Sequence, residues 1–127
     1  MYFVGRRLFE ASEVYAVTAS NVERLRSRRR YGEPSLDWRG SRAARLELSD
    51  ILISRVAKGR PTRKLEERFS LYVLDQLPDG GFVLDSDDIW GWLRLASDSD
   101  DFAPARSERR SWLRSLFGAN PGVSADA

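Results

Sequence analysis

Near the start of the chain, short apolar runs separated by polar residues have the length and composition of β-strands. Residues 2–9 (YFVGRRLF) and 13–18 (EVYAVT) are rich in aromatic and β-branched types, and residues 10–12 predict a short turn between them. A third strand is predicted over residues 22–31 (VERLRSRRRY), before a loop rich in turn-forming residues over 32–41. The front of the chain therefore predicts a small antiparallel sheet.

The rest of the chain shows the wider spacing of apolar residues that is typical of helices. Each predicted helix follows a side chain that is favoured at a helix N-cap. These caps and helices are Ser41 before 42–57, Thr62 before 63–77, and Asp85 before 86–96. The first helix is apolar on two sides, which indicates a central position. Residues 82–84 predict a short extended segment.

These elements predict an α+β fold: an N-terminal antiparallel sheet of two or three strands packed on three helices, followed by a short C-terminal helix. The single domain is expected over residues 1–96. Residues 97–105 predict an acidic linker, residues 106–117 a short amphipathic helix, and residues 118–127 a disordered tail.

The composition removes several classes of chemistry. The 127 residues include no cysteine and no histidine, so disulfides, thiolate nucleophiles and histidine general bases are excluded. No phosphate-binding glycine loop and no catalytic set of side chains is recognisable. We therefore expect a non-catalytic protein with no metal and no cofactor. We find no signal peptide and no apolar run of roughly 20 residues, which predicts a cytoplasmic protein without membrane contact.

The net charge of +2 is unevenly distributed along the chain. Residues 1–45 carry ten arginines against five acidic residues, whereas residues 79–101 carry seven aspartates and one arginine. The basic front could contact nucleic acid, or it could pair with the acidic segment. Pairing between copies would give a homo-oligomer. Of the 21 bases, 19 are arginine, a bias that a GC-rich coding sequence also produces.

The start of the first predicted helix is a candidate anion site. Free N–H groups, the Ser41 hydroxyl and the helix dipole favour an anion there, and three arginines could converge on a phosphate. They are Arg39, Arg42 and Arg45. In the alternative, the helix is simply capped and its arginines lie in solvent, or Arg42 pairs with Asp37.

An arginine stripe on the third predicted strand is a second candidate site. In extended form, alternate residues share one face, and here they are Arg24, Arg26, Arg28 and Arg30. Such a stripe could follow the phosphates of a nucleic acid, with Tyr31 and Trp38 stacking on bases. The alternative is a solvated edge strand whose charges prevent edge-to-edge pairing.

A cluster of aspartates and an apolar helix face can each be explained either by the fold or by a function. Asp85, Asp87 and Asp88 suit the first turn of a helix better than a metal site. The apolar side of the C-terminal helix could dock on the chain's own core or bind a partner. Its residues are Trp112, Leu113, Leu116 and Phe117. Trp90 and Trp92 cannot face the same way on one helix, so one is expected in the core.

Three segments over residues 2–95 resemble a family of small domains of unknown function found in bacteria, archaea, phages and plasmids. They are Tyr2-Phe3-Val4-Gly5-Arg6, then Trp38 with Gly40-Ser41-Arg42-Ala43-Ala44-Arg45-Leu46, then Leu77-Pro78 with Phe82-Val83-Leu84 and Ile89-Trp90-Gly91-Trp92. The family signature is similar to Trp-Gly-Tyr-x-Gly-Ser-Gly-Pro-Ala-Gln-Leu. The resemblance implies a fold and an association with mobile elements, and it implies no activity.

The sequence as a whole favours a non-catalytic accessory protein, associated with a phage or plasmid, that contacts nucleic acid or a nucleoprotein through its arginines. The alternative is a protein–protein interaction module, for example an inhibitor of a host defence complex. That module would use the exposed aromatic residues, the aspartate-rich segment and the C-terminal helix.

Overall fold

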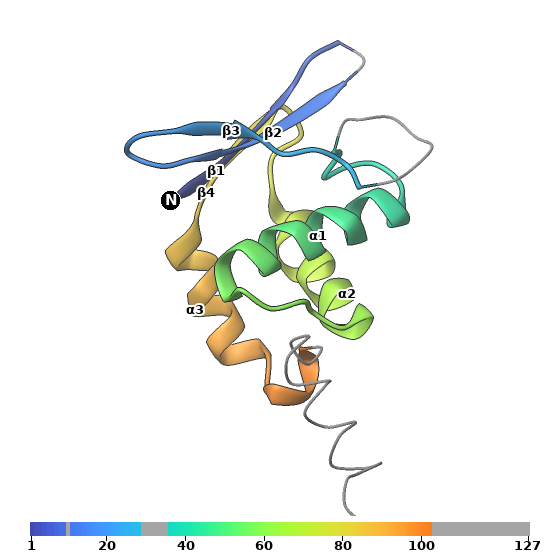
Figure 1. The fold of residues 1–127 in the computed structure, drawn as a ribbon. Coiled ribbons are helices and arrows are strands. Elements are labelled where there is room, and N and C mark those ends of the chain that lie inside the picture. Colours follow the sequence, from blue (N-terminus) through green and yellow to red (C-terminus); the bar gives the residue numbers. More distant parts are fainter. Residues whose placement is uncertain (10, 29–35, 103–127) are drawn as a thin grey trace, which may run out of the picture.

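The protein is described here by a computed structural model, which places residues 1–9, 11–28 and 36–102. These residues form a four-stranded sheet with three α-helices on one of its sides (Figure 1). In chain order the elements are β1 (Tyr2–Arg7), β2 (Ser12–Val17), β3 (Val22–Arg24), α1 (Arg42–Ala57), α2 (Arg63–Tyr72), the 3-10 turn η1 (Leu74–Gln76), β4 (Gly81–Asp85), α3 (Ser86–Ala96) and the 3-10 turn η2 (Ser99–Asp101). The predicted α+β fold class is confirmed.

The sheet is antiparallel throughout, with the strand order β3-β2-β1-β4. It has one strand more than the two or three predicted, because β4 returns from the helices and pairs with β1. Gly5 lies opposite Val14 on β2 and Phe82 on β4. Residues at this register position face the helices, and the next residue along each strand faces away.

The third strand is much shorter than the predicted 22–31. Its ladder ends at Arg24, with one further bond from the Leu25 N–H to the Val14 carbonyl at 2.8 Å. The chain then turns toward α1, where the Ser27 hydroxyl and the Arg28 N–H both donate to the Glu47 carboxylate, each at 2.8 Å. This carboxylate replaces the neighbouring strand as a hydrogen-bond acceptor. Residues 29–31 lie outside the described part of the chain.

Helix α1 matches the predicted residues 42–57 and lies between the sheet and α2 (Figure 1). Apolar residues around its circumference are buried, which is the environment predicted for a helix apolar on two sides. They are Leu46, Leu48, Ile51, Leu52 and Ile53. The helix ends at Lys58, which adopts a left-handed conformation with φ of 56°.

The second predicted helix, 63–77, is divided in two. Helix α2 ends at Tyr72, and the tighter 3-10 turn that follows places Leu74 completely inside the core. Helix α3 matches its prediction, and Asp85 caps it by accepting the Asp87 N–H. Trp92 packs edge-on against Phe69 at 5.4 Å while Trp90 is exposed, so one tryptophan of the pair lies against the core as expected.

The described part of the predicted acidic linker, 97–105, is built into the fold rather than freely solvated. Asp98 and Asp101 form a capping box around η2. The buried Asp101 accepts from Arg68 at 2.7 Å, and its backbone carbonyl accepts the Thr62 N–H at 2.8 Å. Phe102 forms a β-bridge with Pro61. The predicted helix over 106–117 and the tail over 118–127 lie outside the described residues.

Trp38 is the largest completely buried side chain of the core. Its indole N–H donates to the Pro78 carbonyl at 2.9 Å, and its ring meets Phe82 edge-on at 4.9 Å. The Arg7 guanidinium lies 5.4 Å from the ring centre. One side chain thus connects the segment before α1 to β1, to β4 and to the turn between η1 and β4.

Two glycines allow a direct test of packing between β1 and β4. A Cβ on Gly5 would lie 2.1 Å from a ring atom of Phe82, whereas a Cβ on Gly91 in α3 would meet nothing within 4 Å. We expect Gly5→Ala to lower the free energy of unfolding by about 1–3 kcal/mol through overpacking. Gly91→Ala should raise it by up to about 1 kcal/mol through helix propensity. Urea denaturation measures both, and a Gly5→Ala variant as stable as the wild type contradicts the pairing of Gly5 with Phe82.

Candidate functional site

The predicted anion site at the start of α1 is occupied by the protein's own groups. The Ser41 hydroxyl accepts the Ala44 N–H at 3.2 Å, which makes it the N-cap. Arg39 and Arg45 both reach the Asp75 carboxylate, at 3.6 and 3.2 Å. Arg42 instead pairs with Glu67 on α2. The three arginines therefore do not converge on one point. Arg39 and Arg45 connect this segment to η1.

Asp37 organises the same segment, a role that sequence reasoning missed. Its carboxylate accepts from Arg7 at 2.8 Å, from the Ser12 hydroxyl at 3.4 Å and from the Arg39 N–H at 2.9 Å. One alternative offered by the sequence paired Asp37 with Arg42, and the structure pairs Asp37 with Arg7 instead. The only local sign of this role in the sequence is the position of Asp37. An aspartate side chain commonly accepts the backbone N–H two residues later in a turn, here that of Arg39.

The predicted arginine stripe is divided because the strand ends early. Arg24 remains on the sheet, 3.6 Å from Glu13. Arg26 is exposed and makes no ion pair with any carboxylate of the described residues. Arg28 turns toward the helices and donates to Asp50 at 3.3 Å. Arg30 lies outside the described part of the chain.

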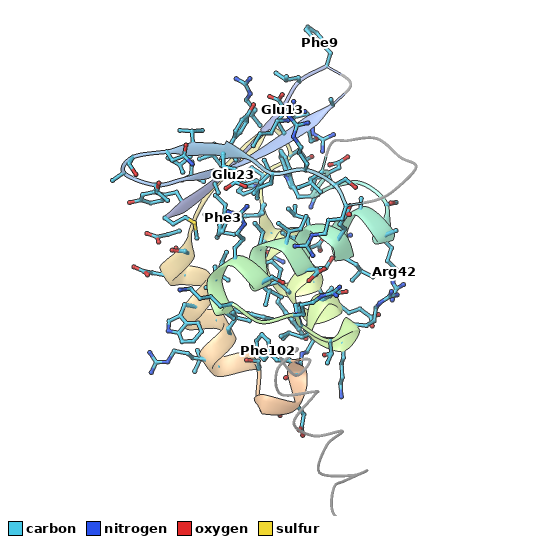
Figure 2. The ribbon with its side chains drawn as sticks, in the orientation of Figure 1. Phe3, Phe9, Glu13, Glu23, Arg42 and Phe102 are labelled. Carbon is cyan, nitrogen blue, oxygen red and sulfur yellow. The ribbon has the colours of Figure 1, made fainter. Side chains whose placement is uncertain are left out.

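Arg28 and Arg42, predicted as members of two separate sites, line one cleft of about 390 Å³. Two further arginines, Arg60 before α2 and Arg63 in its first turn, complete it. We call these four residues the arginine cleft. Arg42 projects outward from the start of α1 (Figure 2). The other lining residues are Ala43, Leu46, Glu47, Asp50 and Glu66.

The ion pairs of the arginine cleft differ in length, and Arg42 has the shortest, with Glu67. Arg28 and Arg60 lie 3.3 and 3.9 Å from the Asp50 carboxylate, and Arg63 lies 4.0 Å from Glu66. The side chains of Arg60 and Arg63 are 71% and 69% exposed. Each guanidinium has five N–H donors, so most donors in the cleft face solvent.

The carboxylates lie deeper in the cleft than the guanidiniums. Burial, together with the nearby charge of Asp50, raises the pKa of Glu66 above its ordinary value. Arg63 and Arg60 act in the opposite direction without cancelling this effect. The cleft thus has a cationic rim over a partly desolvated carboxylate floor.

The side of the sheet that faces away from the helices carries a second candidate surface. Its apolar and aromatic residues come from all four strands, and the register places them on the same face. They are Tyr2, Val4, Tyr15, Val17, Val22 and Val83. No helix of the described residues covers this face (Figure 1). We call it the outer sheet face.

One carboxylate organises the charges on the outer sheet face. Glu13, which Figure 2 labels on the sheet, accepts from Arg6 at 2.8 Å and from the Tyr15 hydroxyl at 3.0 Å, with Arg24 at 3.6 Å. The hydrogen bond from Arg6, followed by that from Tyr15, holds the pKa of Glu13 below its ordinary value. The Arg6 guanidinium lies over the Tyr15 ring, 5.8 Å from its centre.

Three other predictions concern metal ligands, membrane-spanning helices and the partner patch. Within residues 1–9, 11–28 and 36–102, no group of three or more carboxylate, cysteine or histidine side chains could hold a metal ion. In the same residues no helix has the length and apolarity needed to cross a bilayer. The predicted partner patch lies outside the described chain, and it consists of Trp112, Leu113, Leu116 and Phe117.

Comparison of the chain with family models, with curated proteins and with solved structures finds no match. The resemblance noted in the sequence therefore stays a prediction.

Glu66 gives the cleft a testable dependence on pH. An acid whose pKa is raised in the folded state destabilises the fold when it ionises, so stability decreases as the pH rises through that pKa. We expect Glu66→Gln to be more stable than the wild type near neutral pH, with the difference vanishing at about pH 4, below the ordinary pKa of glutamate. Urea denaturation at the two pH values measures this difference.

The matched control is Glu67→Gln, which removes an exposed carboxylate paired with Arg42. It should leave stability unchanged or lower it slightly at neutral pH. If Glu66→Gln is the less stable of the two variants near neutral pH, the desolvated carboxylate floor is contradicted.

Proposed function

We propose that this chain is a non-catalytic accessory protein that binds the phosphate backbone of nucleic acid, free or within a nucleoprotein, in the arginine cleft. The main support is the composition of the cleft. Arg28 of the predicted stripe and Arg42 of the predicted anion site line it together with Arg60 and Arg63. A cytoplasmic location and an association with a phage or plasmid belong to the same proposal, and they are supported by the composition and by the resemblance.

The donor chemistry of the cleft supports a phosphate ligand. Phosphate oxygens accept paired N–H donors from arginine, and charge-assisted bonds of this kind are stronger than neutral ones. Four guanidiniums face the three carboxylates that line the cleft, and Arg42 also pairs with Glu67. The ion pairs of Arg60 and Arg63 are at the limit of contact. Exposed pairs of this kind contribute about 0–1 kcal/mol, so a phosphate can replace them at little cost.

The helix ends provide a second argument. Arg42 and Arg63 are the first residues of α1 and α2, where the helix dipole is positive. A cation at this position is unfavourable by up to about 1 kcal/mol unless a negative charge compensates it. The protein's own compensation is partial, because Arg42 pairs with the exposed Glu67 and Arg63 lies 4.0 Å from Glu66. Both arginines line the same cleft, so one bound anion would add to the compensation at both helix ends.

The alternative function, a protein–protein interaction module such as an inhibitor of a host defence complex, is supported by a different surface. Trp90 and Leu95 are exposed on α3, close in sequence to Asp87 and Asp88 in its first turn. An apolar surface next to acidic residues suits a basic protein partner. A complex with such a partner would survive nuclease treatment and would be lost in Trp90→Ala.

The proposal predicts a specific loss of affinity in Arg60→Gln. Fluorescence anisotropy with labelled duplex DNA, at low and at near-physiological salt, measures the affinity and its salt dependence. The wild type should bind, and Arg60→Gln should bind more weakly, with a log–log salt slope reduced by about 0.9 for one lost phosphate contact.

Arg94→Gln is the matched control, because Arg94 is an exposed arginine on α3 that does not line the cleft. It changes the net charge equally and should leave the salt slope unchanged. Absence of wild-type binding at low salt, or equal losses in the two variants, contradicts the assignment of the cleft.

A further inference from the structure

We propose that the outer sheet face is a base-stacking platform, which makes single-stranded nucleic acid the preferred ligand of this chain. The inference rests on the proposed function, since the cleft would bind phosphates while the sheet binds bases. The two tyrosines of the platform lie on β1 and β2, the central strands of the sheet.

The register brings the two rings close together. Tyr2 is opposite Val17, and Tyr15 is opposite Val4, so the tyrosines are diagonal neighbours on the same face. Diagonal neighbours on adjacent strands lie roughly 7–8 Å apart, a separation that two successive bases of an extended single strand can span. Tyr2 is 50% exposed, so its ring is accessible to a ligand.

The surroundings of the rings fit nucleobases. The Arg6 guanidinium over Tyr15 adds a planar cation, and bases stack on guanidinium planes as well as on aromatic rings. Val83 on β4 and Val22 on β3 extend the apolar area on both sides, and both are exposed. A polar or purely aliphatic face would lack these stacking groups.

Charge complementarity favours a polyanion. Arg6 and Arg24 share the single carboxylate of Glu13, which leaves one positive charge uncompensated around Tyr15. The other carboxylate at this register position, Asp85 opposite Tyr2, accepts the Asp87 N–H and caps α3. The exposed Arg26 follows Arg24 along the same segment, and this segment continues to Arg28 in the arginine cleft. A chain of cations thus connects the two surfaces along residues 24–28.

A duplex cannot use this platform, because its bases are already stacked within the helix. The platform therefore predicts tighter binding of single strands than of duplexes. It also predicts that ring removal affects single strands alone.

The test compares the wild type with the double variant Tyr2→Leu/Tyr15→Leu, using a labelled oligothymidine and a labelled duplex of the same length. Leucine keeps an apolar side chain at each position and removes the ring. The double variant should lose about tenfold or more in affinity for the oligothymidine, since each stacked base contributes a comparable factor, and it should keep its affinity for the duplex. Tyr72→Leu, at an exposed tyrosine on α2, is the matched control and should match the wild type.

A cross-linking experiment on the wild-type protein removes any dependence on how well the double variant folds. An oligonucleotide containing iodouracil is photocross-linked to the protein, and mass spectrometry should identify the peptides that carry Tyr2 or Tyr15. Cross-links confined to other peptides overturn the platform.

The outcomes separate this inference from the proposed function. If the wild type binds neither nucleic acid, the proposed function itself fails. If it binds both equally and the double variant is unchanged, the platform is overturned while the cleft assignment stands, and the outer sheet face is then left for a protein partner.

Discussion

The burial of one indole, that of Trp38, is the constraint on which the rest of the structure depends. Its N–H bond to Pro78 and its edge-on contact with Phe82 fix the segment before α1 against the sheet and the turn that leads into β4. Asp37, the preceding residue, bonds Arg7 and the Arg39 N–H and so prevents this segment from rotating. The start of α1 is therefore set relative to the sheet, and with it the position of Arg42.

The arginines of the cleft differ from those that connect distant segments in the exposure of their side chains. Five arginines connect segments that are distant in the sequence, through short or multiple ion pairs and hydrogen bonds. They are Arg7, Arg39, Arg45, Arg55 and Arg68. The side chains of the four cleft arginines are 55–71% exposed, against 25–37% for the connecting arginines, although Arg42 also has a short ion pair with Glu67. Arginine abundance by itself therefore says little about function in this chain. The cleft arginines retain donors for a ligand, and this distinction supports the cleft over the other basic segments as a phosphate site.

The sequence predicts the helices well because their signals are local. Ser41, Thr62 and Asp85 cap α1, α2 and α3 as expected, through bonds that span two or three residues. The cleft was not predictable, since Arg28 and Arg63 are far apart in the sequence and meet only through the packing of α1 on α2. The length of the third strand was overestimated because its end also depends on a distant residue. The Arg28 N–H donates to Glu47 on α1 instead of to a neighbouring strand. The outer sheet face follows from the alternation in β1 and β2 once the register places Tyr2 beside Tyr15.

The central claim, that phosphates bind in the arginine cleft, is tested most directly by NMR of the arginine Nε–H groups during titration with an oligonucleotide at low salt. We expect the signals of Arg28, Arg42, Arg60 and Arg63 to shift together and to saturate at one affinity. The signals of Arg45 and Arg68, whose Nε atoms are buried, should stay in place. Shifts confined to Arg94 and other residues outside the cleft, or no shift at all, would contradict the account.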